Sequence, residues 1–203
     1  MTIALSELPL FPLRSVLLPG AALGLRVFET RYLDLVRACG RTGGTFGICL
    51  IREGEEVGAP AVPADWGVEA RIEDFDLGGD GVLQLRLRGA RRFQVERTWV
   101  QPGGVVAANV AWKAPDPDDE LRPEHALLAL LLERILEQAG GEFAAAGPAQ
   151  LDQASWLGWR LAELLPLQDA QRLALLQEDD PHRRLDQLLV WIPEFEPQPD
   201  AGP

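Results

Sequence analysis

The spacing of apolar residues changes once along the chain, and this change constrains the fold more than any other feature. Up to residue 112, apolar and polar residues largely alternate, which is typical of half-buried strands. After residue 124, apolar residues recur at helical spacing. Between them lies APDPDDELRPE, residues 114–124, a proline-rich acidic stretch typical of a domain boundary. We therefore predict an α+β chain with a β-subdomain at 1–115, a helical bundle at 116–193 and a disordered acidic, proline-rich tail at 194–203.

The first half predicts a small barrel. Alternation is clearest at 68–75, 83–87, 93–99 and 106–112, and residues 45–52 form a short apolar run suited to a buried strand. Glycine-rich turns separate these runs, as at Gly78 to Gly81. Closely spaced strands joined by such turns predict a small antiparallel barrel or folded sheet, with the first helix covering an opening.

The stretch from Leu8 to Arg37 contains both kinds of pattern. Its first apolar run is interrupted by Pro9 and Pro12, so we expect it at a strand end or a sheet edge. Residues 22–28 read as a second strand, and Glu29 or Thr30 caps the helix that follows. We expect Gly40 to end that helix.

This stretch closely resembles the opening of the Lon N-terminal domain family, the substrate-recognition module at the head of ATP-dependent Lon proteases that also occurs as a free-standing small protein. The matching segments are PLFPL at 9–13, LPG at 18–20 and LRVFETRY at 25–32, and further matches lie at 70–75, 161–167 and 179–181. The family commonly has proline where this chain has Thr30. The resemblance covers nearly the whole chain and implies a PUA-like β-subdomain followed by a helical subdomain.

In the second half, glycine, aspartate and proline mark the helix ends. Gly140 ends the first predicted helix, and residues 143–148 are expected to be flexible. Asp152 and Asp169 are expected to begin two further helices, and Asp180 with Pro181 at the first helical position begins the last. The predicted product is a helical bundle.

The chain lacks the residues of the two activities that full-length Lon proteases carry. Lys113 is the only lysine and lies between Trp112 and Ala114, so no phosphate-binding loop of the Walker type exists. The serines are Ser6, Ser15 and Ser155, and none lies in a nucleophile elbow. We therefore expect no ATPase, no protease and no cofactor. The alternative is an uncharacterised hydrolase whose residues converge only in the fold.

Other reactive side chains favour structural roles. His125 and His182 fall in different predicted helices, and we expect each at the surface or at a helix cap. Cys39 and Cys49 have no metal-binding spacing, which favours free buried thiols. Glu73 and Asp74 are neighbours on one strand, so their side chains point to opposite faces and do not form a catalytic pair.

Charge bears on the partner class. The formal net charge is −12, which disfavours nucleic acid. The most basic stretch holds Arg86, Arg88, Arg91 and Arg92, and because PUA-like folds often bind RNA, an RNA-binding protein remains an alternative. We expect these arginines on the solvent side of two paired strands, facing carboxylates. The sequence shows no signal peptide and no membrane span, so we expect a cytoplasmic protein.

The leading hypothesis is a non-catalytic module that binds unfolded or exposed polypeptide. We expect a shallow apolar groove at the β-subdomain and first helix, rimmed by charge. The candidate residues are Phe28 and Tyr32 for apolar contact, with Glu29 and Arg31 to fix orientation. The competing interpretation places Phe28 and Tyr32 in the core and makes the two charges a capping pair. The bound partner and the oligomeric state stay open.

Overall fold

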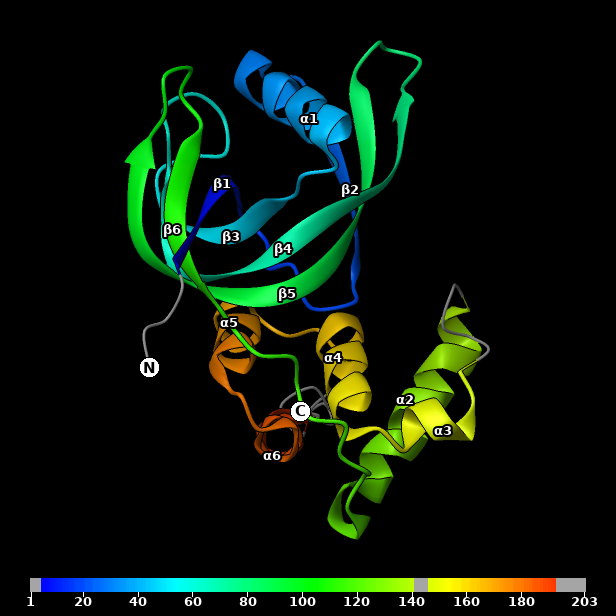
Figure 1. Ribbon diagram of the computed structural model, residues 1–203. Coiled ribbons are helices and arrows are strands. Elements are labelled where there is room, and N and C mark those ends of the chain that lie inside the picture. The colour runs from blue at the N-terminus through cyan, green and yellow to red at the C-terminus, as the bar shows by residue number, and fades with distance from the viewer. Residues whose placement is uncertain (1–4, 141–145, 193–203) are drawn as a thin grey trace, which may run out of the picture. The chain divides into compact units, whose positions relative to one another are not determined.

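The computed structural model describes residues 5–140 and 146–192 (Figure 1). The chain divides into two compact units, Met1–Pro115 and Asp116–Pro203. The predicted tail at 194–203 and residues 143–145 of the predicted flexible segment at 143–148 lie outside the described residues.

The first unit is a closed barrel. Its strands are β1 (Leu5–Leu13), β2 (Ala22–Val27), β3 (Phe46–Glu53), β4 (Val62–Leu77), β5 (Leu83–Val100) and β6 (Val106–Trp112). The strand order is β2-β5-β4-β3-β1-β6, and β5 also pairs with β6, which closes the ring. All neighbouring pairs are antiparallel except β1 with β3, which is parallel. The α+β class and the barrel are therefore confirmed, with one parallel pairing that alternation did not reveal.

The prolines of β1 are accommodated by staggered partners. β1 lies between β3 and β6, so it is not a sheet edge, but Pro12 lies next to its last residue, as the alternative of a strand end predicted. However, Leu5 to Leu10 pair with β6, whereas Leu10 to Leu13 pair with β3. Pro9 therefore has a partner only in β6 and Pro12 only in β3. Each proline therefore has a neighbouring strand on one side only, which is the kind of position in a sheet that tolerates a residue without an N–H.

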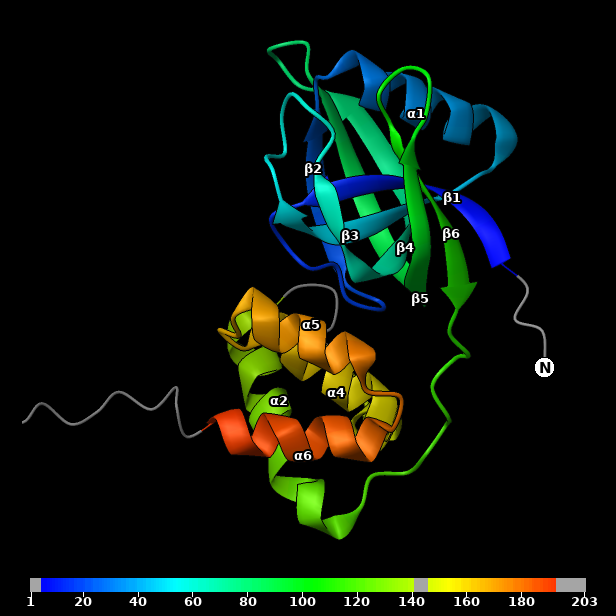
Figure 2. The same cartoon turned by 90° about the vertical axis from the view of Figure 1, so that its left-hand side faces the viewer.

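Helix α1 (Thr30–Thr42) lies at one end of the barrel (Figures 1 and 2). Glu29 occupies its N-cap position in an extended conformation. The helix does not end at Gly40, as predicted, but continues for two more residues. It ends at Gly43, whose φ of 66° lies in the left-handed region that favours glycine. A glycine within the last turn is tolerated, and only Gly43 adopts the terminating conformation.

The barrel interior is built around Phe93 of β5, which is fully buried. Its ring makes an edge contact with Trp112, at 5.7 Å between ring centroids. Two glycines on neighbouring strands leave the space for this ring. A Cβ atom built on Gly47 would lie 2.5 Å from Phe93 Cζ, and one on Gly67 would lie 2.6 Å from the same atom. Both positions therefore require glycine.

The second unit is helical. It contains a 3₁₀ turn at Pro123–His125 followed by α2 (Ala126–Ala139), α3 (Pro148–Leu151), α4 (Ala154–Leu164), α5 (Asp169–Gln177) and α6 (Pro181–Trp191). Helix α4 packs against α2 and α6 (Figure 2). The core of this second unit consists of fully buried leucines, among them Leu132, Leu157, Leu161, Leu185 and Leu188. No helix within residues 5–140 and 146–192 has the length and hydropathy needed to cross a membrane.

The predicted helix ends are partly confirmed. Asp180 caps α6 as predicted, accepting hydrogen bonds from the backbone N–H groups of His182 and Arg183. Gly140 ends α2. The start of α4 was misplaced by one residue, because Gln153 and not Asp152 holds the N-cap position.

The two histidines are buried together, so the prediction of a surface position was wrong for both. His125 does occupy the N-cap position of α2, but its side chain makes no capping hydrogen bond. His125 has 0% of its surface exposed and His182 has 4%. Their rings stack with centroids 5.5 Å apart, and the two Nδ1 atoms are 3.5 Å apart. His125 Nε2 also contacts the carboxylate of Asp186 at 2.7 Å. The 3₁₀ turn before α2 and the first turn of α6 bring together two residues that are 57 positions apart.

Candidate functional site

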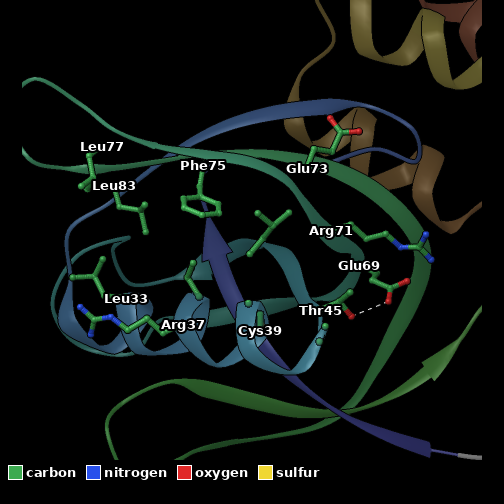
Figure 3. A pocket seen from close by; sticks show the side chains of 15 residues that line it. Leu33, Arg37, Cys39, Thr45, Glu69, Arg71, Glu73, Phe75, Leu77 and Leu83 are labelled. Carbon is green, nitrogen blue, oxygen red and sulfur yellow. Dashed lines mark hydrogen bonds between the residues drawn. The ribbon is translucent and has the colours of Figure 1, made fainter.

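A large groove lies between α1 and the hairpin formed by β4 and β5. We call it the hairpin groove. Its volume is about 1090 Å³. One wall is α1, and the other consists of the far part of β4 and the start of β5 (Figure 3). All lining residues belong to the first unit.

The helix wall is a single stripe of α1. Leu33, Val36, Arg37 and Gly40 line it, at the spacing that places residues on one helical face. Around Gly40, a Cβ atom would meet nothing within 4 Å. The glycine thus leaves open space in the groove, although glycine costs a helix about 1 kcal/mol relative to alanine.

The hairpin wall presents large apolar side chains. Phe75 is 71% exposed and Leu77 is 67% exposed. Figure 3 shows Phe75 projecting from β4 toward α1, with Leu83 of β5 nearby. Single exposed apolar residues are common on protein surfaces, but adjacent ones that line one hollow mark an interaction surface.

A polar cluster lies where β4 leaves the barrel. Glu69 is only 3% exposed and accepts hydrogen bonds from Thr45 Oγ1 at 2.8 Å and from Arg91 Nε at 2.9 Å. Burial by itself raises the pKa of Glu69, but the hydrogen bonds from Arg91 and Thr45 and the charges of Arg91 and Arg71 outweigh it, so the net pKa is lowered. Glu69 is therefore a buried carboxylate at the groove wall.

The residues expected to bind peptide lie elsewhere, around the first turn of α1. Tyr32 is 3% exposed, and its ring stacks on Phe11 with centroids 3.7 Å apart. Glu29 and Arg31 form an ion pair at 3.0 Å. Phe28 is 58% exposed. Phe28, Glu29 and Tyr32 line a separate pocket of about 40 Å³, far smaller than the hairpin groove.

Sequence reasoning did not identify Phe75, Leu77 or Gly40 as candidate binding residues. A signal was present in β4, since Ile72 and Phe75 are three residues apart and break the strict alternation. The structure places a register shift between Ile72 and Asp74, which changes the face on which apolar residues fall. A break in period therefore marked the start of the groove wall.

The basic stretch is neutralised within the sheet. Arg88 Nε lies 2.8 Å from Glu73, and Arg86 pairs with the same carboxylate at 3.3 Å. Arg91 pairs with Glu69 at 2.9 Å. These arginines face carboxylates as expected, but Arg92 is only 5% exposed and does not lie on the solvent side.

Other reactive groups do not gather at the groove. Cys39 and Cys49 are free and buried, as predicted, and burial raises the pKa of both thiols. Across the part of the chain that the structure describes, no three histidine, cysteine or acidic side chains are arranged to hold a metal ion.

Comparison with known proteins identifies the family. The model of the ATP-dependent protease La (LON) substrate-binding domain matches residues 7–194. The chain is 63% identical to a Lon N-terminal domain protein from Xanthomonas campestris of known crystal structure. That similarity covers 92% of this chain and 98% of the other, with a TM-score of 0.79.

A more distant structure shares the fold. The N-terminal domain of a Mycobacterium avium complex Lon protease is 21% identical, with a TM-score of 0.66, over 94% of this chain and 100% of that one. Comparison with curated proteins finds no match. The family match over most of the sequence and the close structural relative lead to one conclusion: this chain belongs to the Lon substrate-binding domain family.

Proposed function

We propose that the protein binds unfolded or exposed polypeptide in the hairpin groove, without cleaving it. The observation that carries this proposal is the exposure of Phe75 and Leu77 on the wall of a hollow of about 1090 Å³. The family supports a role in substrate binding. The groove supplies a surface on which that role can operate.

The energetics favour weak, broad recognition. Burying an exposed phenylalanine or leucine side chain gains about 1.5–3 kcal/mol. Ordering an extended segment offsets part of that gain, so affinity in the micromolar range or weaker is expected. Folded proteins bury their apolar side chains, whereas unfolded ones offer them to the groove. Selectivity for unfolded chains follows without a specific sequence motif.

Two phenylalanines of similar exposure allow a matched test of the site. Fluorescence anisotropy of a labelled unfolded polypeptide measures binding, and a compact folded protein with the same label is the control. We expect Phe75→Ala to weaken binding at least fivefold and Phe28→Ala to change it less than twofold. The opposite result would move the site to the first turn of α1, where Phe28, Glu29, Arg31 and Tyr32 were predicted to act. Gel electrophoresis after titration checks that the polypeptide stays intact.

Gly40 gives a second test that does not depend on removing contacts. Leucine favours helix and its side chain would extend into open space, so Gly40→Leu should raise stability by about 0.5–1 kcal/mol. The same side chain would occupy the groove and should reduce polypeptide affinity. A variant that is more stable but binds as well as the parent would count against the hairpin groove.

A further inference from the structure

Part of β4 is an unpaired sheet edge beside the hairpin groove. β3 pairs with β4 only as far as Ala70. From Arg71 to Leu77, β4 is paired with β5 on one side. Among the described strands, none pairs with the other side of this stretch. The free edge and the apolar wall of the groove therefore belong to the same residues.

The direction of the peptide groups follows from the hairpin register. Gly78 N–H donates to Val82 C=O at 2.9 Å, which makes Gly78 and Val82 a hydrogen-bonded pair. In an antiparallel ladder, bonded and non-bonded pairs alternate, so Asp76 with Gln84 is bonded and Leu77 with Leu83 is not. The N–H and C=O groups of Phe75 and Leu77 thus point away from β5, toward the free edge.

Both of these N–H groups are held by neighbouring aspartates. Phe75 N–H donates to Asp74 Oδ1 at 2.9 Å, and Leu77 N–H donates to Asp76 Oδ1 at 2.8 Å. Both aspartates are exposed. Charged side chains at a strand edge are a common protection against unwanted pairing. Here the carboxylates occupy the two donors that an added strand would use.

We propose that the bound polypeptide adds to β4 as an extra strand. Its carbonyls replace the two carboxylates as acceptors for the N–H groups of Phe75 and Leu77. Alternate side chains then enter the groove between Phe75 and the α1 stripe, and the intervening positions lie near the released carboxylates of Asp74 and Asp76. Charge complementarity with these carboxylates and with the net charge of −12 favours segments in which apolar residues alternate with lysine or arginine. This inference rests on the proposed function.

Backbone methylation of the ligand tests main-chain pairing with the unaltered protein. The probe is a labelled peptide of alternating valine and lysine, compared with one form N-methylated at every valine and another N-methylated at every lysine. On a strand, residues with side chains on one face direct their peptide groups to the same side. One methylated form should therefore lose at least tenfold in affinity, while the other stays within threefold of the parent.

The outcomes separate the two proposals. Equal affinities of the two methylated peptides would overturn strand addition while leaving groove binding intact. Failure of the parent peptide and of an unfolded polypeptide to bind would overturn the proposed function and this inference together.

A variant pair provides the complementary test on the protein. Phe75→Ala and Phe75→Pro both remove the ring, but only proline also removes the N–H that faces the edge. Because that N–H makes no bond to β5, proline is compatible with this edge position. We expect Phe75→Pro to bind the parent peptide at least fivefold more weakly than Phe75→Ala, with similar thermal unfolding. Equal binding by two folded variants would contradict strand addition.

Discussion

Arg184 and Asp116 form a buried ion pair in which Arg184 Nη1 donates to Asp116 Oδ2 at 2.8 Å. Their side chains are 0% and 8% exposed. The same oxygen accepts hydrogen bonds from Ser155 Oγ at 2.7 Å and from Trp159 Nε1 at 2.8 Å. The guanidinium also lies over the Trp159 ring, 3.6 Å from its centroid. One carboxylate at the start of the helical unit therefore holds residues of both α4 and α6.

Removing the charge of this carboxylate should destabilise the helical unit. We expect Asp116→Asn to cost about 3 kcal/mol, because Arg184 would stay buried opposite a neutral group. Asp118→Asn is the matched control, since Asp118 is exposed and contacts Gln153, and it should change stability by less than about 0.5 kcal/mol. Urea unfolding followed by tryptophan fluorescence measures both. Equal midpoints for the two variants would show that the buried charge is not needed.

The histidine pair should show coupled effects on stability. His125→Phe keeps a stacking ring but removes the nitrogen that faces His182 Nδ1, and it should cost about 1–3 kcal/mol. His182→Phe should cost a similar amount. Each single variant leaves the remaining imidazole without its partner, whereas the double variant removes both imidazoles. The double variant should therefore lose less stability than the two single variants added together, by about 1 kcal/mol or more. Additive losses in thermal unfolding would argue against an interaction between the rings.

Glycine should be required at the centre of the barrel and dispensable at its rim. Gly47→Ala and Gly67→Ala each place a Cβ atom within 2.7 Å of the Phe93 ring and should destabilise by about 1–3 kcal/mol. Gly24→Ala in β2 meets nothing within 4 Å and should be neutral or slightly stabilising. Chemical unfolding of the three variants provides the comparison. Tolerance at Gly47 and Gly67 would mean that Phe93 can move.

The buried carboxylate of Glu69 should make the barrel sensitive to acid. Its pKa is lowered in the folded state, so near and below the ordinary glutamate value of about 4.3 the unfolded chain binds more protons. The stabilisation is present above that value and is lost as pH falls through the lowered pKa. At neutral pH, Glu69→Gln should cost about 1 kcal/mol, because the side chain of its partner Arg91 is 48% exposed.

The pH dependence is measured as the difference in urea midpoint between the parent and Glu69→Gln. This difference should shrink as the pH is lowered from about 7 to about 3. A difference that does not change with pH would mean that the charge of Glu69 contributes nothing to folding.

Local chemistry explains which parts of the fold could be predicted from the sequence. Asp180 followed by Pro181 suffices to start a helix, because the cap and the proline ring act within one turn. Alternation located β4, β5 and β6 for a similar reason. Gly40 was misread because a glycine does not reveal its φ angle, and only the structure separates it from Gly43. The stacking of His125 on His182 depends on contacts between elements far apart in the sequence.

The sequence led us to expect the general character of the candidate groove but not the residues that line it. A charged, apolar groove beside the first helix was expected, and the hairpin groove has those features. Its wall depends on a register shift in β4 that turns Phe75 and Leu77 toward α1. Tyr32 was chosen for its aromatic ring, but stacking on Phe11 uses that ring inside the unit. A sequence shows that a side chain is apolar but not which of its neighbours will cover it.

The staggered pairing of β1 also has a consequence for folding during synthesis. Leu5 pairs with Ala111, so the first strand of the barrel needs the last one. At about 5–20 residues per second, the ribosome adds the intervening residues over on the order of 5–20 seconds. Throughout that interval the backbone groups of β1 that later pair with β6 can pair with other nascent chains. Pro9 belongs to the part of β1 that pairs with β6, and it has no N–H to donate. A proline in an unpaired strand is a common protection against pairing with other chains, so Pro9 should limit aggregation during synthesis.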